Sequence, residues 1–312
     1  YYIMKVLVTG GAGFIGSHLV RQLIANGDEV YVLDNLSTGS LSHLPRAGFT
    51  FWKQDIRDNN IIQQIIFAQF DAIVHLAAQT MVDASIKDPE FDATENILGT
   101  IHVLEAARKS NVRRVIFAST AAAYGDVAEN VLPIRETEKL KPMSFYGLSK
   151  VTVEKYLALY NKMYGLNYVI CRFANVYGER QGDSGEGGVI SIFAKRIANG
   201  QDITIFGDGE QTRDFVYAGD IAAGICKALV TDKMNTVYNL STQTETSLNE
   251  LVDILGKVAG CKLPIAHGPV REGDIYRSML SNEKAVNNLM WKPAVGLLKG
   301  LHRTYDYFVK QG

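Results

Sequence analysis

Three glycines at the junction of an apolar run and a helical stretch constrain this chain more than any other feature. Gly10, Gly13 and Gly16 follow the apolar run Met4–Thr9 and open a stretch, Phe14–Asn26, with apolar residues at helical spacing. The first glycine of such a triplet makes a tight turn, the second lets the backbone approach a pyrophosphate, and the third lets helix and strand pack closely. Free N–H groups at the helix start then attract an anion. The segment therefore predicts a dinucleotide-binding strand, turn and helix.

Further apolar runs alternate with amphipathic helical stretches over the first half of the chain. Strands that are apolar throughout indicate a parallel sheet that helices cover on both faces. We therefore predict an α/β fold, a doubly wound Rossmann-type parallel sheet with a smaller C-terminal α/β substrate lobe. The predicted strands are Glu29–Leu33, Phe49–Lys53, Ala72–Leu76, Arg114–Ser119 and Tyr168–Phe173, and the predicted helices are Pro89–Lys109 and Ser144–Tyr164.

The rhythm loosens after about residue 175. Gly178–Gly188 is rich in glycine and charge and predicts a loop, whose closure over a ligand the sequence leaves open. Ser247 and Glu250 have the spacing of a capping box at the start of a helix. We expect a dinucleotide-binding domain over residues 1–174, to which residues 219–242 return, and a lobe built mainly from residues 175–312. Helices are predicted at 189–200, 219–230 and 247–259, short strands within 204–217, and a strand of the main sheet at 237–240.

Composition excludes several classes of protein. The 312 residues suit one large domain with a smaller lobe, and the formal net charge of −1 favours neither nucleic acid nor an anionic membrane as partner. No apolar run approaches the length of a membrane span, and no charged segment precedes an apolar core near Tyr1. The 3 cysteines lie far apart and the 6 histidines are scattered, so neither disulfides nor a metal site is expected. We expect a cytoplasmic protein, with Tyr1–Ile3 as an added or extended start.

An acidic residue closes the second predicted strand. In dinucleotide-binding folds a carboxylate at this place accepts hydrogen bonds from the ribose hydroxyls and repels a 2′-phosphate. Asp34 therefore predicts NAD rather than NADP as the cofactor. Acidic and apolar side chains after the third strand fit around an adenine, and small residues after the fourth strand let the dinucleotide lie across the strand ends. These further cofactor contacts are Asp55, Ile56, Leu76, Ala77 and Ala78.

A tyrosine and a lysine four residues apart open the predicted helix at 144–164. Tyr146 and Lys150 share one helix face, so the ammonium group can lie beside the phenol. A phenol with a pKa of about 10 is a poor base at neutral pH, and a nearby cation together with the positive nicotinamide of NAD⁺ lowers that value. Ser119 and Thr120 end the fifth strand, where side chains face the ligand crevice. We predict that Thr120 hydrogen-bonds the oxygen with which Tyr146 exchanges a proton.

With these elements in order, the chain resembles the extended short-chain dehydrogenase/reductase family, and within it the UDP-glucose 4-epimerases. The resemblance covers nearly the whole chain. The segments that carry it are TGGAGFIG (Thr9–Gly16), DNLSTG (Asp34–Gly39), HLAAQ (His75–Gln79), ENILGT (Glu95–Thr100), STAAAYG (Ser119–Gly125), YGLSK (Tyr146–Lys150), RFANVYG (Arg172–Gly178), FGDGEQTRDFVY (Phe206–Tyr217) and REGD (Arg271–Asp274).

The resemblance implies an isomerase with tightly bound NAD that interconverts UDP-glucose and UDP-galactose through a transient 4-keto sugar. It also implies a role in galactose metabolism and a homodimer formed by the helices near 89–109 and 144–164. The further cofactor contacts that it implies are Phe14, Ile15, Asn35, Ser37, Thr38, Gly39, Asn96 and Ser119. The implied UDP-sugar contacts are Thr80, Thr120, Asn175, Val189, Ile190, Thr204, Phe206, Arg213, Arg271, Asp274 and Ser278.

Three alanines after the fifth strand favour epimerisation within this family. Related dehydratases and decarboxylases place acidic residues where Ala121–Ala123 stand, and alanine can neither deliver nor remove a proton. Two positions depart from the pattern of many UDP-galactose epimerases, because Thr80 stands where those carry a lysine and Ser278 where some members carry a bulky tyrosine. The small Ser278 leaves room for an N-acetyl group, so the N-acetylated pair of UDP-sugars is a further expected substrate.

Two other functions stay open on the sequence alone. A dehydratase, decarboxylase or C4 reductase for nucleotide sugars uses the same scaffold. A non-catalytic regulatory protein that binds a dinucleotide needs the glycine turn but not the proton-transfer residues. The presence of Thr120, Tyr146 and Lys150 together weighs against the second of these.

Overall fold

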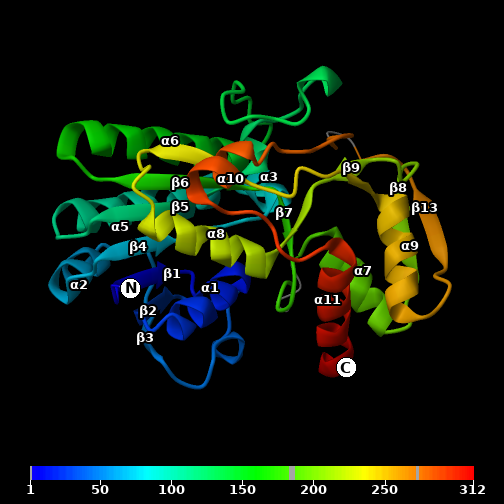
Figure 1. Ribbon diagram of the computed structural model, residues 1–312, viewed down its shortest axis with the longest axis horizontal. Helices are drawn as coiled ribbons and strands as arrows, with labels where there is room; N and C mark the ends of the chain where they lie inside the picture. Colours follow the sequence, from blue (N-terminus) through cyan, green and yellow to red (C-terminus); the bar gives the residue numbers. More distant parts are fainter. Residues whose placement is uncertain (1, 183–186, 272–273) are drawn as a thin grey trace.

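Seven parallel strands form the centre of the molecule, in the order β11-β6-β5-β4-β1-β2-β3 (Figure 1). The computed structural model describes residues 2–182, 187–271 and 274–312. From β1 the chain first moves outward through β2 and β3 and then returns to β4 on the other side, so the strand order reverses between β1 and β4. Ligands bind beyond the carboxyl ends of the strands at such a point. The strands are β1 (Lys5–Thr9), β2 (Glu29–Asp34), β3 (Phe49–Lys53), β4 (Ala72–His75), β5 (Arg114–Thr120), β6 (Tyr168–Phe173) and β11 (Thr236–Leu240).

Helices cover both faces of this sheet, as the apolar strands predict. Val6 and Val8 of β1 belong to one buried cluster with α1 (Phe14–Ala25) and α8 (Ala218–Val230), whereas Leu7 belongs to a second cluster on the opposite face. Successive side chains of a strand point to opposite faces, so each strand contributes to both clusters. The doubly wound Rossmann-type fold is confirmed. The helices of the second face are α2 (Asn60–Ala68), α5 (Gly99–Arg108) and α6 (Phe145–Tyr164).

The stretch predicted as one helix over 89–109 is interrupted. It consists of α4 (Pro89–Ala93), one π-helical turn (Thr94–Leu98) and α5, with α3 (Val82–Lys87) before it. Asp88 caps α4 by accepting a hydrogen bond from the backbone N–H of Phe91 at 3.0 Å. A π turn adds a residue to the helical repeat and is frequent at functional sites. Here it carries Asn96 and ends at Gly99, where a Cβ would come within 2.7 Å of the Ile56 side chain.

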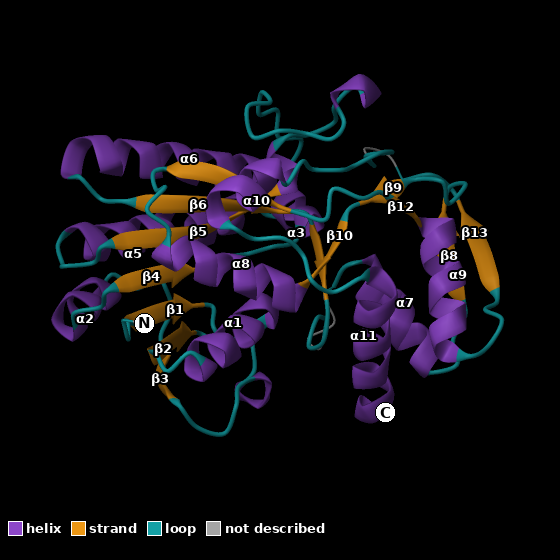
Figure 2. Ribbon diagram, viewed as in Figure 1, coloured by secondary structure: helices purple, strands orange, loops and turns teal. Residues whose placement is uncertain are grey.

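The second lobe has its own apolar core, to one side of the sheet in Figure 2. The strand β11 pairs with β6, in line with the expected return of residues 237–240 to the main sheet. The capping box of Ser247 and Glu250 is confirmed at the start of α9. The remaining helices are α7 (Val189–Ala198), α9 (Leu248–Ala259), α10 (Glu283–Leu289) and α11 (Leu297–Gln311), with 3₁₀ turns at Leu41–His43, Ala121–Ala123 and Glu129–Val131. The remaining strands are β7 (Asn175–Tyr177), β8 (Ile203–Phe206), β9 (Thr212–Arg213), β10 (Phe215–Tyr217), β12 (Thr246–Ser247) and β13 (Ile265–Gly268).

In the described parts of the chain, no helix combines the length and the apolar character needed to cross a membrane. Tyr1, of the predicted added start, lies outside the described residues. The division into a domain over 1–174 and a lobe over 175–312 stays a prediction.

Candidate active site

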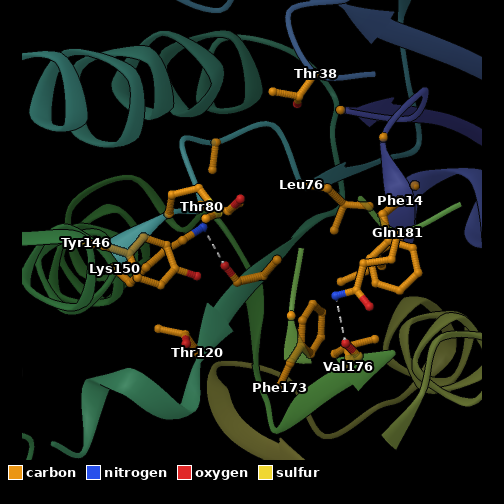
Figure 3. Close-up of a pocket in the computed structure, with 18 of the residues that line it drawn as sticks. Phe14, Thr38, Leu76, Thr80, Thr120, Tyr146, Lys150, Phe173, Val176 and Gln181 are labelled. Atoms are coloured by element: carbon orange, nitrogen blue, oxygen red, sulfur yellow. Dashed lines mark hydrogen bonds between the residues drawn. The ribbon is translucent and has the colours of Figure 1, made fainter. Parts of the chain in front are cut away.

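One cavity of about 660 Å³ extends from the carboxyl ends of the parallel strands to the second lobe. Its wall includes residues at the ends of β1, β2, β4, β5 and β6, and it continues to Arg213 and Ser278. Figure 3 shows Phe14, Leu76 and Gln181 on one side of it and Thr120, Tyr146 and Lys150 on the other. A dinucleotide and a second ligand can therefore meet in the same space.

The glycine turn brings the start of α1 to this cavity. Gly10 has a φ of 69°, and a Cβ there would lie 2.7 Å from the backbone nitrogen of Ala77. A Cβ on Gly16 would lie 2.2 Å from the carbonyl oxygen of Gly10, so both positions require glycine. Gly13 is the N-cap residue of α1, and no side chain caps the helix. Amides at such an end bind a pyrophosphate, and this cradle fits the diphosphate of NAD.

Asp34 is held in place by two backbone amides. Its Oδ2 accepts a hydrogen bond from Ala12 at 3.0 Å and its Oδ1 accepts one from Leu36 at 2.9 Å. Burial raises the pKa of this carboxyl group, and the two amide bonds oppose the rise. Each carboxylate oxygen keeps a further acceptor position, and the residue lines the cavity. The geometry therefore suits recognition of two ribose hydroxyls.

The side of the cavity predicted to hold the adenine contains an ion pair that the sequence analysis missed. Asp55 accepts a hydrogen bond from the Asn35 side chain at 3.0 Å and a bidentate pair from Arg57 at 3.0 and 2.7 Å. The bond from Arg57 holds the pKa of Asp55 well below its ordinary value. Arg57 fixes the carboxylate and does not itself line the cavity. The position of Arg57 two residues after Asp55 is the feature of the sequence that could have predicted this ion pair.

The structure brings Thr120, Tyr146 and Lys150 together, as predicted. Lys150 donates a hydrogen bond to the backbone carbonyl of Ala118 at 2.9 Å, and its Nζ lies 5.9 Å from the centre of the Tyr146 ring. The Thr120 hydroxyl accepts a hydrogen bond from the Ala122 amide at 3.1 Å and lies on the cavity wall with Tyr146. Ser144 orients the start of α6 by accepting a hydrogen bond from the Gly147 amide at 3.0 Å. The phenol, the hydroxyl and the ammonium group therefore face one point of the cavity (Figure 3).

Burial dominates the acid–base properties of this group. It lowers the pKa of Lys150 to about 8, while the charges of Asp92 and Glu154 act in the opposite direction. Burial also raises the pKa of Tyr146, and the neighbouring Thr120 hydroxyl only partly offsets this. In the protein without NAD⁺ the Tyr146 pKa is therefore raised, and its lowering by the lysine together with the positive nicotinamide stays a prediction. The positive charge that NAD⁺ supplies at the cavity acts in the required direction.

Asn96 does not lie on the cavity wall, although it is a predicted cofactor contact. It is 2% exposed, accepts a hydrogen bond from the Gln79 amide at 2.8 Å, and its own amide lies 3.1 Å from Oδ1 of Asp92. Asn96 therefore holds the turn after β4, and its contact with the nicotinamide stays a prediction. Ser119 does line the cavity and donates to Glu154 at 2.6 Å. The other predicted cofactor residues on the wall are Gly10, Gly13, Phe14, Ile15, Gly16, Asp34, Asn35, Ser37, Thr38, Gly39, Asp55, Ile56, Leu76, Ala77 and Ala78.

The predicted substrate contacts divide into two groups. Thr80, Thr120, Asn175, Arg213 and Ser278 lie on the cavity wall. The other six are not part of the wall among the described residues. These are Val189, Ile190, Thr204, Phe206, Arg271 and Asp274.

Tertiary contacts explain where the second group lies. Ile190 is 1% exposed and packs in the core of the lobe. The guanidinium of Arg271 lies 4.0 Å from the centre of the Phe206 ring, and Asp274 Oδ1 is 3.6 Å from the guanidinium of Arg213. Arg213 is thus the one predicted phosphate-binding arginine that this structure places on the wall. Glu272 and Gly273, in the segment between Arg271 and Asp274, lie outside the described residues.

Several polar side chains on the cavity wall were missed in the sequence, among them Arg180, Gln181 and Arg277. Arg180 and Gln181 come from the predicted loop over 178–188, of which residues 183–186 lie outside the described part, so its predicted closure stays open. The Gln181 amide donates to the carbonyl of Val176 at 3.1 Å. Arg277 makes a bidentate pair with Glu245 at 2.9 and 2.7 Å. Their positions depend on the approach of the two lobes, and no local pattern marks them.

A dinucleotide turn, a carboxylate for the ribose and a tyrosine–lysine pair on one cavity define an NAD-binding oxidoreductase-type site. The model of the NAD dependent epimerase/dehydratase family matches residues 6–241. The chain is 45% identical to the putative UDP-glucose 4-epimerase of Methanocaldococcus jannaschii, over 97% of each chain. The chain belongs to the NAD dependent epimerase/dehydratase family, and its cofactor is NAD.

Two solved structures show how far the similarity extends. The UDP-glucose 4-epimerase of Thermotoga maritima with UDP-glucose superposes with a TM-score of 0.95, at 42% identity and 99% coverage of both chains. The UDP-glucose 4-epimerase of Thermus thermophilus in complex with NAD has a TM-score of 0.91, at 40% identity, covering 98% of this chain and 99% of that one. The fold and the extent of this chain thus match those epimerases over nearly their whole length.

Proposed function

We propose that this protein is a UDP-hexose 4-epimerase that interconverts UDP-glucose and UDP-galactose, a step of galactose metabolism. The observation that carries the proposal is the convergence of Thr120, Tyr146 and Lys150 on a wall that continues as Ala121 and Ala122. In this proposal the domain over 1–174, with residues 219–242, holds NAD. The lobe formed mainly by 175–312 holds the UDP-sugar.

The side chains of this site do the proton work. Tyr146 takes the proton of the sugar 4-hydroxyl and later returns it, and Thr120 holds the same oxygen by a hydrogen bond. Lys150 places a positive charge beside the phenolate. The turn around Gly10 and the Asp34 carboxylate would hold NAD, whose nicotinamide would supply the acceptor and donor of hydride for C4 of the sugar. The protein is unchanged after one turnover, and the product differs from the substrate only in configuration at C4.

Arg213 is the side chain proposed to bind the diphosphate. It lies on the wall, donates a hydrogen bond to the carbonyl of Thr212 at 2.6 Å, and keeps further N–H groups that can point to phosphate oxygens. Asn175 and Thr80 line the same cavity and are proposed sugar-side contacts. With the diphosphate fixed at one end, the sugar reaches Tyr146 at the other.

Dehydration on this scaffold requires acid and base side chains, and the cavity wall directly after β5 has none at Ala121 and Ala122. Elimination of water needs an acid and a base beside the sugar, and Ala121 and Ala122 supply neither. The test is to incubate the protein with UDP-glucose and NAD and to analyse the product by mass and by chromatography. An epimerase gives UDP-galactose of equal mass. A product that has lost water, or no product, would contradict the proposal.

The N-acetylated pair of UDP-sugars is a second proposed substrate. Ser278 lies on the cavity wall, and its small side chain leaves space beside the sugar. We expect the unaltered protein to turn over UDP-N-acetylglucosamine. We expect Ser278→Tyr to lose this activity and to retain turnover of UDP-glucose. If the unaltered protein does not turn over UDP-N-acetylglucosamine, this part of the proposal fails.

We also propose a homodimer. The helices α3, α4 and α6 pack together, and their outer surface exposes large apolar side chains of the kind that mark an interface. Sedimentation should show a dimer that Leu159→Glu disrupts, whereas Leu298→Glu on α11 should leave it intact. A monomeric unaltered protein would contradict this. The exposed side chains are Ile86, Phe91, Leu98, Phe145, Leu148, Leu159 and Met163.

We propose a cytoplasmic location because the cysteines form no disulfide bond among the described residues. Cys171, Cys226 and Cys261 are free, which fits a reducing compartment. Fractionation of cells that express the tagged chain tests this directly, and recovery in a secreted or membrane fraction would contradict it.

A further inference from the structure

A buried carboxylate outside the cavity wall lies on a helix that packs against the helix of the catalytic pair. Asp92 is the fourth residue of α4, is 1% exposed, and belongs to neither the predicted site nor the cavity wall. Its Oδ1 accepts hydrogen bonds from the side chains of Gln79 at 2.8 Å and Asn96 at 3.1 Å. No described residue donates to its Oδ2. Two neutral donors do not balance a buried charge, so this carboxylate needs a cation nearby.

Lys150, on the neighbouring helix α6, is a buried cation on which this charge acts. Helix α4 packs against α6, and the charge of Asp92 favours the protonated form of Lys150. The Lys150 ammonium is buried and has one hydrogen-bond partner among the described residues, the carbonyl of Ala118 at 2.9 Å. Each of the two groups therefore lowers the cost of burying the other. The same negative charge also acts on the Tyr146 phenol and opposes its ionisation.

A hydrogen-bonded chain connects Asp92 to the catalytic helix. The Asn96 amide that faces Asp92 also lies 3.2 Å from the Ser149 hydroxyl. That hydroxyl donates to the backbone carbonyl of Tyr146 at 2.8 Å. These contacts connect α4 to the first turn of α6, and the two that Asn96 makes are buried.

The other ionisable groups near Lys150 are paired with another residue, neutral, or exposed to solvent. Glu154 also favours the protonated form of Lys150, but it forms a buried bidentate pair with Arg172 at 2.9 and 2.6 Å, and Asp92 is the larger of the two influences. His75 is buried between Thr9 and Thr100, and burial followed by the charge of Lys150 lowers its pKa to about 3. Of the acids and bases on neighbouring elements, Glu95 faces Arg57 at 3.9 Å, and Asp83 and Lys87 of α3 are solvent-exposed.

We infer that Asp92 is a positioning residue of this active site, the buried counter-charge that keeps Lys150 a cation beside Tyr146 and sets the pH range in which the pair works. The inference rests on the proposed function for its kinetic consequence, but the charge coupling itself is a property of the folded chain. Asp92 touches neither substrate nor cofactor and acts only through Lys150, Tyr146 and Asn96.

The kinetic test is the pH profile of kcat/KM for UDP-glucose in Asp92→Asn. An asparagine Oδ1 can still accept from Gln79 and Asn96, so the change removes mainly the charge. The charge of Asp92 favours protonated Lys150 and disfavours the Tyr146 phenolate, so its removal should lower the pKa of both groups. We expect the acidic and the alkaline limbs to move to lower pH together, by about half a unit or more. Limbs at the pH of the unaltered protein would overturn the inference.

Two further variants separate charge from folding. Asp88→Ala removes the cap of the same helix at an exposed position, so we expect a lower melting temperature with both limbs in place. Asp92→Ser is a second neutral variant, needed if the amide of Asn does not fit the two donors, and it should shift both limbs in the same direction. An equal shift in Asp88→Ala would show that loosening α4 is the cause and would overturn the inference.

A thermodynamic cycle tests the coupling without turnover. Unfolding by urea is measured for the unaltered protein, Asp92→Asn, Lys150→Met and the double variant. Loss of either charge alone leaves the other buried and uncompensated, so we expect the double variant to be more stable than the sum of the single effects allows. Additive effects would overturn the inference. Because the cycle needs no substrate, its outcome is separate from a failure of the proposed epimerase activity, which the UDP-glucose assay reports.

Discussion

The two halves of the cavity are built in different ways. On the dinucleotide side, the turn around Gly10 and the carboxylate of Asp34 each belong to one short segment that follows a strand of the central sheet. On the sugar side, Thr80, Asn175, Arg213 and Ser278 come from four distant segments and meet only in the folded chain. A site made of local segments can be read from sequence spacing, whereas a site assembled from distant loops depends on how the lobes pack.

The catalytic pair lies between the two halves, and its loss should have the largest effect. Tyr146→Phe removes the group that takes and returns the proton while keeping the ring. We expect kcat to fall by about two or more orders of magnitude, with NAD affinity nearly unchanged. Single-turnover kinetics and calorimetric titration with NAD measure the two quantities. An unchanged rate would show that the proton is transferred elsewhere in the cavity.

The sugar half is next in the expected size of effect. Arg213→Met should raise KM for UDP-glucose about 10- to 100-fold, the cost of losing charge-assisted hydrogen bonds to phosphate. NAD affinity should stay the same, because Arg213 belongs to the other half. Arg271→Met is the matched variant, since its guanidinium stacks on Phe206 in this structure. If Arg271→Met has the larger effect on KM, Arg271 rather than Arg213 binds the substrate, although only Arg213 lines the cavity in this structure.

A change at Asp34, in the dinucleotide half, should alter NAD affinity and leave KM for UDP-glucose unchanged. Asp34→Asn removes the charge that accepts from the ribose hydroxyls, so we expect NAD affinity to fall about 10-fold. Loss of the negative charge also removes the repulsion of a 2′-phosphate, so NADP affinity should rise. Calorimetric titration with both dinucleotides measures this, with KM for UDP-glucose at saturating NAD as the control. Unchanged discrimination between NAD and NADP would remove Asp34 from its proposed role.

The last expected effect concerns stability rather than activity and again lies on the dinucleotide side. His75 is buried as the neutral form with its pKa lowered to about 3, against an ordinary value near 6.5 in the unfolded chain. Between these values the unfolded chain binds more protons than the folded one, so acidification favours unfolding. The stability that is present above pH 6.5 should be lost at up to about 1.4 kcal/mol per pH unit as the pH falls from 6.5 toward 3.

Urea denaturation at a series of pH values measures this dependence. His75→Asn keeps a polar side chain between Thr9 and Thr100 but cannot take up a proton, so its stability should depend less on pH over this window. An equal dependence in the variant would assign the effect to other groups, of which His18, also buried with a lowered pKa, is the first candidate.

Local sequence determined the parts of this protein whose physics is local. The glycine spacing at 10, 13 and 16, the apolar strands and the capping box of Ser247 each predict an element that the structure contains. The spacing of Tyr146 and Lys150 places both on one face of a helix, because residues four apart are neighbours there. The type of fold and the chemistry of the catalytic pair follow from such short-range rules.

Only the tertiary structure decided which distant side chains meet and what charge they carry. It interrupted the helix over 89–109 with a π turn, buried Ile190 in a core and stacked Arg271 on Phe206. It also packed the helix of Asp92 against that of Lys150 and made burial the main influence on the pKa of Tyr146. The physical reason is that desolvation and charge coupling depend on contacts between segments far apart in the chain, which spacing along the sequence does not determine.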